Sequence, residues 1–230
     1  MYQVRLFLKL ENIMKLALFD MDHTLVAADS SALWNEFLWE KKLISAAQRA
    51  LREQFVDDYH QARLDIKAAY AFELEMIQAL PPEQRLALRE EYLRTKLAPF
   101  LTVKGQAKIR HHREQGEHII IITATVDFIA EPVADYFKAD TLIASRAEMI
   151  DGRYTGDFIP EPCIGAGKLR CFEHWLKQQA IKPTYITFYS DSQNDLPLLY
   201  HADKAIAVDP DPVLKKIAEE KNWEIVSFRE

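Results

Sequence analysis

Cysteine is scarce in this sequence. Only two occur in 230 residues, Cys163 and Cys171, which is too few for a disulfide framework and too few for a metal site built from cysteines. A small number of unpaired cysteines is typical of a reducing compartment, so we expect a cytoplasmic protein.

Long apolar segments are also absent. The longest uncharged apolar run lies around residues 119–122, far below the roughly 20 residues that a membrane-spanning helix needs. Four charged side chains interrupt the first fifteen residues: Arg5, Lys9, Glu11 and Lys15. These charges, and the lack of a small-residue cleavage site, argue against a secretory signal. Because Met14 directly precedes a strong strand pattern, we expect residues 1–13 to be an extension upstream of the original start.

The chain has no excess of positive charge. It carries 29 lysine and arginine residues against 35 aspartate and glutamate residues, a formal net charge of −6 at pH 7. Surfaces that bind nucleic acid or anionic membranes need a positive balance, so neither partner is expected. The apolar fraction of 49% and the charged fraction of 28% are those of an ordinary globular protein.

Glycine is missing from residues 30–100. This stretch is rich in strong helix formers, its apolar residues recur at helical spacing, and the adjacent Pro81 and Pro82 are predicted to separate two helices. We therefore expect an all-helical insertion over residues 30–100. The length of 230 residues then leaves one core domain, made of residues 1–29 and 101–230.

Strand and helix patterns alternate in the rest of the chain. Strands are predicted at 15–19, 118–122, 140–144, 185–189, 205–208 and 224–227, helices at 104–115, 127–137, 168–179, 195–200 and 211–221, and a hairpin at 148–158. This alternation predicts an α/β fold with a Rossmann-like, doubly wound parallel sheet that has helices on both faces. The helical insertion would follow the first strand.

Polar side chains gather where several of these strands end, or where a helix begins beside them. In chain order they are Asp20, Asp22, Thr123, Lys168, Asp191, Asn194 and Asp195. Ligands of such folds bind outside the carboxyl ends of the strands, so we expect these residues to form one site.

The pair Asp20 and Asp22 indicates a metal site. Residues two apart in an extended strand end point the same way, so both carboxylates are expected to face one site. Like charges this close raise each other's pKa unless a cation lies between them, and Asp191 can add a third carboxylate around a hard divalent ion. Mg²⁺ keeps several waters and binds phosphate oxygens, which predicts a phosphorylated substrate.

A site of this composition can transfer a phosphoryl group. Lys168 can neutralise charge on the phosphate, and Thr123 can donate a hydrogen bond to one of its oxygens. One carboxylate of the aspartate pair can act as nucleophile. The other can protonate the leaving oxygen and later activate water.

The motifs resemble those of the haloacid dehalogenase (HAD) superfamily of phosphohydrolases. DMDHT at residues 20–24 is similar to motif I, IIIIT ending at Thr123 to motif II, Lys168 in GKL to motif III, and SDSQND at residues 190–195 to motif IV. The four motifs occur in the family's order. The helical insertion and the 23 residues from Lys168 to Asp191 resemble the phosphoserine-phosphatase-like branch, subfamily IB, which has a C1 cap.

The resemblance implies a Mg²⁺-dependent phosphomonoesterase that acts on a small phosphorylated metabolite. Asp20 would be the nucleophile that forms an aspartyl-phosphate, and Asp22 would be the general acid and base. Thr123 and Lys168 would hold the phosphoryl group, with Lys168 also steadying Asp20.

The resemblance also implies a metal site. Asp20, the backbone carbonyl of Asp22, and Asp191 would hold Mg²⁺. The residues that would order the loop around the metal are Thr24, Asn194 and Asp195.

The segment around Asp29 bears on the substrate. Phosphoserine phosphatases usually carry a substrate-binding glutamate shortly after motif I, where this chain has Asp29, and its VAADSSALW segment resembles small phosphatases that include enzymes acting on histidinol phosphate. Histidinol phosphate is therefore the first candidate substrate and phosphoserine the second. Asp29 and His23 are candidate substrate residues, although Asp29 fits equally well as the N-cap of the helix that follows it.

Other functions remain open at this point. A phosphomutase or phosphotransferase would use the same chemistry but return the phosphoryl group to a sugar instead of to water. A receiver-type signalling module also has an aspartate, a threonine and a lysine at strand ends, but it is shorter and lacks both the paired aspartates and the insertion. An inert binding protein on the same fold would not need all four motifs.

Overall fold

The protein is described by a computed structural model, which covers residues 12–61 and 63–229. Residues 1–11, most of the predicted upstream extension, lie outside the described residues. The remaining two residues of that extension, Asn12 and Ile13, form the start of the first strand.

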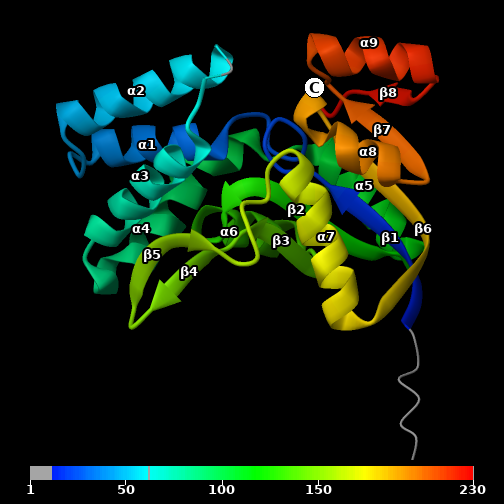
Figure 1. The fold of residues 1–230 in the computed structure, drawn as a ribbon, viewed down its shortest axis with the longest axis horizontal. Coiled ribbons are helices and arrows are strands. Elements are labelled where there is room, and N and C mark those ends of the chain that lie inside the picture. The colour runs from blue at the N-terminus through cyan, green and yellow to red at the C-terminus, as the bar shows by residue number, and fades with distance from the viewer. Residues whose placement is uncertain (1–11, 62, 230) are drawn as a thin grey trace, which may run out of the picture.

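Six parallel strands form one sheet (Figure 1). Their order is β3-β2-β1-β6-β7-β8, so the first strand of the chain lies near the middle. The strands are β1 (Asn12–Phe19), β2 (His118–Val126), β3 (Thr141–Ser145), β6 (Ile181–Ser190), β7 (Lys204–Val208) and β8 (Glu224–Val226). The predicted parallel sheet is confirmed, and the carboxyl ends of β1, β2 and β6 meet at one edge.

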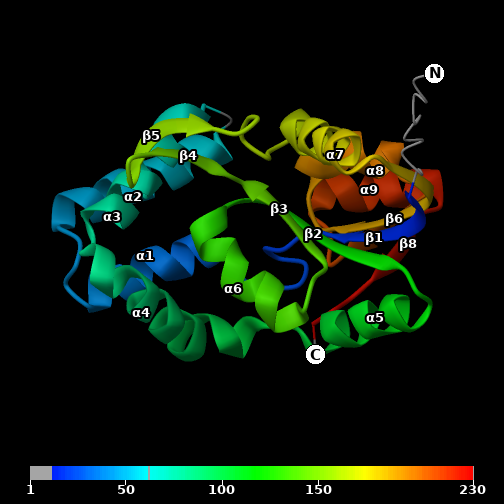
Figure 2. The ribbon, with the colours of Figure 1, turned by 90° about the horizontal axis from the view of Figure 1, so that it is seen from below.

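Each face of the sheet has its own hydrophobic core because successive strand residues point to opposite sides. On β1, Ala17 and Phe19 belong to one cluster, and Leu16 and Leu18 belong to the other; all four are fully buried. The helices that cover the two faces are α5 (Val103–Glu114) and α6 (Asp127–Phe137) on one side, and α7 (Ala166–Gln179), α8 (Leu196–His201) and α9 (Pro212–Lys221) on the other. Figure 2 shows the two layers above and below the strands, which makes the sheet doubly wound.

In the segment between β1 and α5, the helices and turns named for the described residues are all helical in type. It contains α1 (Ser30–Glu40), α2 (Ala46–His60), α3 (Ile66–Ala79), α4 (Pro82–Tyr92), a π-helical turn (Leu93–Leu97) and a 3₁₀ turn (Ala98–Phe100). Pro82 starts α4, as the paired prolines predict, because proline is tolerated in the first helical turn. Asp29 and Asp65 cap α1 and α3 with their side chains.

A two-stranded hairpin lies beside this helical segment. It consists of β4 (Ala147–Ile150) and β5 (Arg153–Phe158), which pair antiparallel as predicted. The hairpin contacts α3: the backbone N–H of Tyr154 donates to the Gln78 side chain at 3.2 Å. The helices and the hairpin therefore flank the same end of the sheet (Figure 1).

One strand boundary differs from the prediction in a way that affects the site. The sequence predicts that the second strand ends at Ile122, but β2 continues to Val126. The pairing of β2 with β3 shifts register between Ile122 and Val126. Thr123 and Thr125 therefore both lie within the strand, two residues apart.

No helix within residues 12–61 and 63–229 has the length and apolar character needed to cross a membrane.

Candidate active site

A cavity of about 580 Å³ lies between the carboxyl edge of the sheet and the helical segment. Of the ten residues that the sequence singles out, the cavity is lined by Asp20, Asp22, His23, Asp29, Thr123, Lys168, Asp191, Asn194 and Asp195. The tenth, Thr24, lies behind the lining and is fully buried. Residues from distant parts of the chain thus meet at one place.

Asp20 follows the last residue of β1 and is held at the sheet edge. Its backbone N–H donates to the carbonyl of Tyr189 on β6 at 2.9 Å, so the pairing of β1 with β6 extends one residue past the strand. Only 6% of Asp20 is exposed. The carboxylate is therefore fixed at the floor of the cavity by the central strand of the sheet.

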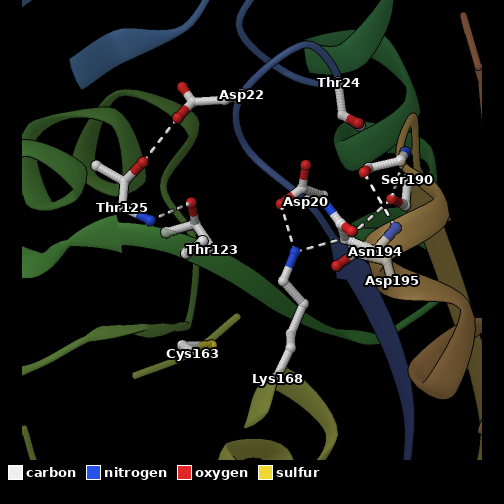
Figure 3. Close-up of polar contacts among 12 residues, drawn as sticks. Asp20, Asp22, Thr24, Thr123, Thr125, Cys163, Lys168, Ser190, Asn194 and Asp195 are labelled. Atoms are coloured by element: carbon white, nitrogen blue, oxygen red, sulfur yellow. Dashed lines mark hydrogen bonds and ion pairs between the residues drawn. The ribbon is translucent and has the colours of Figure 1, made fainter. Parts of the chain in front are cut away.

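Lys168 is the buried cation of the site (Figure 3). Its Nζ lies 2.8 Å from Asp20 Oδ1 and 2.7 Å from Asp195 Oδ2. Burial alone would lower the pKa of Lys168, but the carboxylates of Asp195 and Asp20 outweigh it and raise the pKa above the usual range. Lys168 therefore stays charged, and its ammonium group forms ion pairs with both carboxylates.

Ser190 and Asp195 complete the support of this lysine. The Ser190 hydroxyl donates to the same Asp195 oxygen at 2.7 Å, and Ser190 is fully buried at the end of β6. From the sequence, Ser190 is expected at a strand end, but no role is predicted for its side chain. Its contact with Asp195 depends on the 3₁₀ turn Gln193–Asp195, which brings the chain back over the strand.

Asp191 lies against Asp20. Burial raises the pKa of Asp191 to about 9, and the neighbouring carboxyls of Asp20 and Asp195 add to the increase. The Thr24 hydroxyl donates to Asp191 Oδ1 at 3.2 Å and fixes the orientation of this carboxyl group. Two acids in contact at a cavity wall need either a shared proton or a cation.

The donor set fits a hard divalent ion, although not with three carboxylates. Asp20 and Asp191 are adjacent, but no group of three or more His, Cys, Asp or Glu side chains within the described part of the chain could hold a metal. Mg²⁺ is commonly bound through one or two carboxylates together with waters and substrate oxygens. The pair Asp20 and Asp191, supplemented by a backbone carbonyl, matches that pattern.

Asp20 and Asp22 line the same cavity, but the Asp22 side chain does not point the same way as that of Asp20, contrary to the prediction. In Figure 3 its carboxylate turns away from Asp20 and toward Thr125. The chain leaves the extended conformation after β1: the N–H groups of Leu25 and Val26 both donate to the carbonyl of Met21, and His23 has a φ of 58°. A turn replaces the strand end, so the period of two that the prediction assumed does not apply.

The Asp22 carboxyl group accepts three hydrogen bonds. The donors are the backbone N–H and the hydroxyl of Ser30, both at 3.0 Å, and the Thr125 hydroxyl at 2.6 Å. Burial raises the pKa of Asp22 to about 7, and the charges of Asp29 and Asp20 contribute, while the hydroxyl contacts oppose the shift. Asp22 is therefore able to gain or lose a proton near neutral pH.

Sequence reasoning missed Thr125 and Ser30. Residues two apart in a strand point to the same face. A longer predicted strand would therefore have placed Thr125 on the same face as Thr123. The prediction ended the strand too early to apply this periodicity. Thr123 itself is buried, and its hydroxyl accepts the Thr125 N–H at 3.1 Å, which leaves its own proton to donate into the cavity.

Asp29 and His23, the two candidate substrate residues, both line the cavity and also form hydrogen bonds within the protein. Asp29 caps α1 by accepting the Ala32 N–H at 2.7 Å, and it lies 3.7 Å from the Arg52 guanidinium. It therefore acts as an N-cap and also lines the cavity. His23 is exposed at the cavity wall, and its backbone carbonyl accepts a hydrogen bond from Arg229 at 2.7 Å.

Known proteins are similar to this chain in sequence and in fold. The chain matches the model of the haloacid dehalogenase-like hydrolase family over residues 17–200. It is 35% identical over 221 residues to the histidinol-phosphatase of Neisseria meningitidis serogroup C (strain 8013), and the match covers 93% of this chain and 99% of that protein. It is 28% identical over 222 residues to the phosphoserine phosphatase SerB1 of Mycobacterium tuberculosis (strain ATCC 25618 / H37Rv), covering 93% and 70% of the two chains.

A solved structure of a protein with unknown function from Bordetella pertussis Tohama I is similar over almost the whole chain. The TM-score is 0.88 at 33% identity, and the match covers 95% of this chain and 100% of that chain.

Together with these matches, the sheet, its two helical layers and the site at the carboxyl edge identify the protein as a hydrolase of the α/β class. The chain belongs to the haloacid dehalogenase-like hydrolase family. Both curated relatives are named as phosphatases, and the predicted class, a phosphatase of this family, is confirmed.

Proposed function

We propose that the protein is a Mg²⁺-dependent phosphomonoesterase that hydrolyses a small phosphorylated metabolite through an aspartyl-phosphate. The observation that carries the proposal is the contact of Lys168 with Asp20 at 2.8 Å on the floor of a cavity that Asp22, Thr123 and Asp191 also line. A buried carboxylate beside a fixed cation, open to a cavity of substrate size, is suited to attack a phosphorus atom.

Asp20 is the proposed nucleophile. One of its carboxylate oxygens forms a bond to phosphorus while the bond from phosphorus to the ester oxygen breaks. Lys168 holds the other oxygen in place, so the attacking group is oriented before substrate arrives.

Asp22 is the proposed general acid and base. It donates its proton to the departing ester oxygen and thereby releases an alcohol. It then takes a proton from the water that attacks the aspartyl-phosphate, which yields inorganic phosphate and restores the Asp20 carboxylate. Ser30 and Thr125 keep the carboxyl group at one wall of the cavity.

The phosphoryl oxygens need positive charge and hydrogen-bond donors. Lys168 supplies charge and the Thr123 hydroxyl supplies a donor. Asp20, Asp191 and the backbone carbonyl of Asp22 would hold Mg²⁺, which when bound neutralises phosphoryl charge. Thr24, Asn194 and Asp195 support this side of the site, Thr24 through Asp191 and Asp195 through Lys168.

The helical segment, residues 30–100, is the proposed cap. It contributes one wall of the cavity, and its closure over a bound substrate would keep bulk water from the aspartyl-phosphate. The similarity to a protein named histidinol-phosphatase, at 35% identity, supports histidinol phosphate as the first candidate and phosphoserine as the second. Free Cys163 and Cys171 are in keeping with a cytoplasmic enzyme.

The test uses p-nitrophenyl phosphate and purified protein. Asp20→Asn is expected to keep the fold, as judged by circular dichroism, and to lower kcat by several orders of magnitude. EDTA is expected to abolish wild-type activity and added Mg²⁺ to restore it. Full activity of the variant, or of the metal-free enzyme, would refute the mechanism.

Hydrolysis in ¹⁸O-labelled water separates a phosphatase from a phosphotransferase. A phosphatase releases inorganic phosphate that carries one oxygen from water. A phosphomutase or phosphotransferase instead passes the phosphoryl group to a sugar hydroxyl, and the label does not enter the phosphate ester.

A further inference from the structure

The cavity extends from the phosphoryl site into the helical segment, where its walls are mostly apolar. The apolar side chains of this part are Phe55, Val56, Leu64, Ile66, Phe72 and Met76. Such a surface suits the carbon body of a ligand, including a flat ring. Among these side chains lies one carboxylate, Glu73, on the cavity face of α3.

One carboxylate oxygen of Glu73 has no hydrogen-bond donor from the described residues around it. Its Oε1 is buried and has no hydrogen-bond partner among the described residues. Among the described residues, the Ser31 side chain is the hydrogen-bonding group that lowers the pKa of this carboxyl group. A buried carboxylate oxygen without a donor costs free energy unless water or a ligand supplies the donor.

The charges nearby do not supply a free counterion. The lysine and arginine side chains that line the cavity are Lys168 and Arg52. Lys168 is bound to Asp20 and Asp195, and Arg52 lies 3.7 Å from Asp29. The cap side of the cavity therefore has two acids, Asp29 and Glu73, and one base.

The pKa of Glu73 agrees with this geometry. Burial raises it to about 7; the hydrogen bond from Ser31 lowers it, Asp29 raises it further and Arg52 lowers it. A ligand with a positive charge would stabilise the ionised form, whereas a ligand carboxylate would be repelled by Glu73 and Asp29.

We propose that Glu73 selects the substrate by binding a cationic nitrogen, a protonated amine or an imidazolium, on a phosphate monoester whose phosphoryl group lies at Asp20. This inference rests on the proposed phosphatase function and adds to it the chemical class of the substrate. The preferred ester carries a positive charge and an apolar or aromatic body at the end opposite the phosphate. An ester that also has a carboxylate at that end, as phosphoserine has, is disfavoured.

The test compares Glu73→Gln with wild type on three esters. Histidinol phosphate is cationic and has no carboxylate, phosphoserine has an amine and a carboxylate, and p-nitrophenyl phosphate is uncharged at the far end. The glutamine side chain keeps the shape of the glutamate but removes its charge, so the comparison isolates electrostatics. Glu75→Gln is the matched control, because Glu75 lies on the same helix and is exposed.

Wild type is expected to prefer histidinol phosphate over both other esters in kcat/KM. In Glu73→Gln, the ratio of kcat/KM for histidinol phosphate to that for p-nitrophenyl phosphate should fall on the order of tenfold or more, mainly through KM. Glu75→Gln should keep the wild-type ratio. A merely structural role for Glu73 would lower activity on all three esters together.

Two results would overturn the inference in distinguishable ways. In the first, wild type hydrolyses p-nitrophenyl phosphate, and the ratio of kcat/KM for histidinol phosphate to that for p-nitrophenyl phosphate in Glu73→Gln stays within about twofold of the wild-type ratio. Glu73 then does not select the substrate, and the phosphatase function stands. If wild type hydrolyses none of the three esters, the proposed function fails and the inference fails with it.

Discussion

Lys168 Nζ lies 2.8 Å from Asp20 Oδ1, although 148 residues separate the two in the chain. The contact exists because Asp20 directly follows β1, near the middle of the sheet, and Lys168 lies in the first turn of α7, which covers one face of the sheet. Since both residues are buried, neither charge has solvent as an alternative partner. The contact therefore matters to the stability of the fold as well as to the chemistry of the site.

Replacing the buried cation should cost both activity and stability. Lys168→Met leaves Asp20 and Asp195 buried without a counterion, so the free energy of unfolding is expected to fall by about 3–5 kcal/mol. The rate should fall on the order of 10²–10³-fold because a donor to the phosphoryl group is lost. Urea denaturation and p-nitrophenyl phosphate kinetics measure the two effects.

The control for Lys168 is Lys96→Met. Lys96 pairs with Glu40 at 2.6 Å on the solvent-facing side of the helical segment, and such pairs contribute at most about 1 kcal/mol. Equal stability losses in the two variants would contradict the importance of the buried contact.

The contact between Asp191 and Asp20 predicts a metal-dependent change of stability. Asp191→Asn keeps an oxygen that can accept from Thr24 but removes one of two adjacent acids. Without metal at pH 7, the variant is expected to be more stable than wild type, because Asp191 has to take up a proton on folding and asparagine does not. Saturating Mg²⁺ should then stabilise wild type, by about 2.7 kcal/mol at 100 times Kd, and leave the variant nearly unchanged. Thermal melts with EDTA and with Mg²⁺ test this, and equal stabilisation of both proteins would exclude Asp191 as a ligand.

Asp22→Asn should separate the two halves of the reaction. p-Nitrophenolate leaves without help from an acid, so formation of the aspartyl-phosphate is expected to continue. Its hydrolysis needs a base and should slow by roughly 10²–10⁴-fold. Stopped-flow absorbance should show a burst of p-nitrophenolate of about one equivalent per site, followed by a slow phase. Wild-type turnover in the variant would show that Asp22 is not the base.

Glu73 predicts a pH dependence of stability. Its folded pKa is raised to about 7 from the usual 4.5, so between these values the folded state binds a proton that the unfolded state has lost. The free energy of unfolding therefore falls as pH rises from about 4.5 to 7. The groups that face this carboxyl are Ser31, Asp29 and Arg52.

Glu73→Gln removes that dependence. The difference in unfolding free energy between the variant and wild type should grow in favour of the variant by roughly 1–3 kcal/mol from pH 4.5 to pH 7. Urea titrations at several pH values measure it, and Glu75→Gln serves again as the control. A difference that stays constant with pH would mean that the folded protein does not shift this pKa.

Much of the fold could be predicted from local patterns. A strand buried on both faces is an unbroken apolar run, as in residues 119–122, and only a few positions in the chain offer one. The order of the motifs then placed Asp20, Thr123, Lys168 and Asp191 at one edge, where the cavity is found. Breaks within the helical segment were harder to predict. The turn between α1 and α2, for example, uses a left-handed Lys42 with a φ of 58° instead of a glycine or proline.

The remaining features depend on tertiary contacts that leave no local signal. The turn of Asp22 toward Thr125 follows from how the chain folds back onto Met21. Glu73 occupies an ordinary polar position in the sequence of α3, and only the packing of that helix over the cavity leaves its Oε1 buried. Sequence spacing cannot distinguish such a residue from the exposed Glu75 two positions later.

Tyr70, on α3, ties the helical segment to the catalytic strand. Its hydroxyl donates to the carbonyl of Ala124, the residue after Thr123, at 2.5 Å, and it lies 3.0 Å from the Ser145 hydroxyl. Ser145 in turn accepts the N–H of Cys163 at 2.9 Å, from the loop that leads into the helix of Lys168. If α3 moves outward to admit a ligand, the hydrogen bonds of the Tyr70 hydroxyl have to break. The position of that helix is therefore coupled to the backbone beside both Thr123 and Lys168.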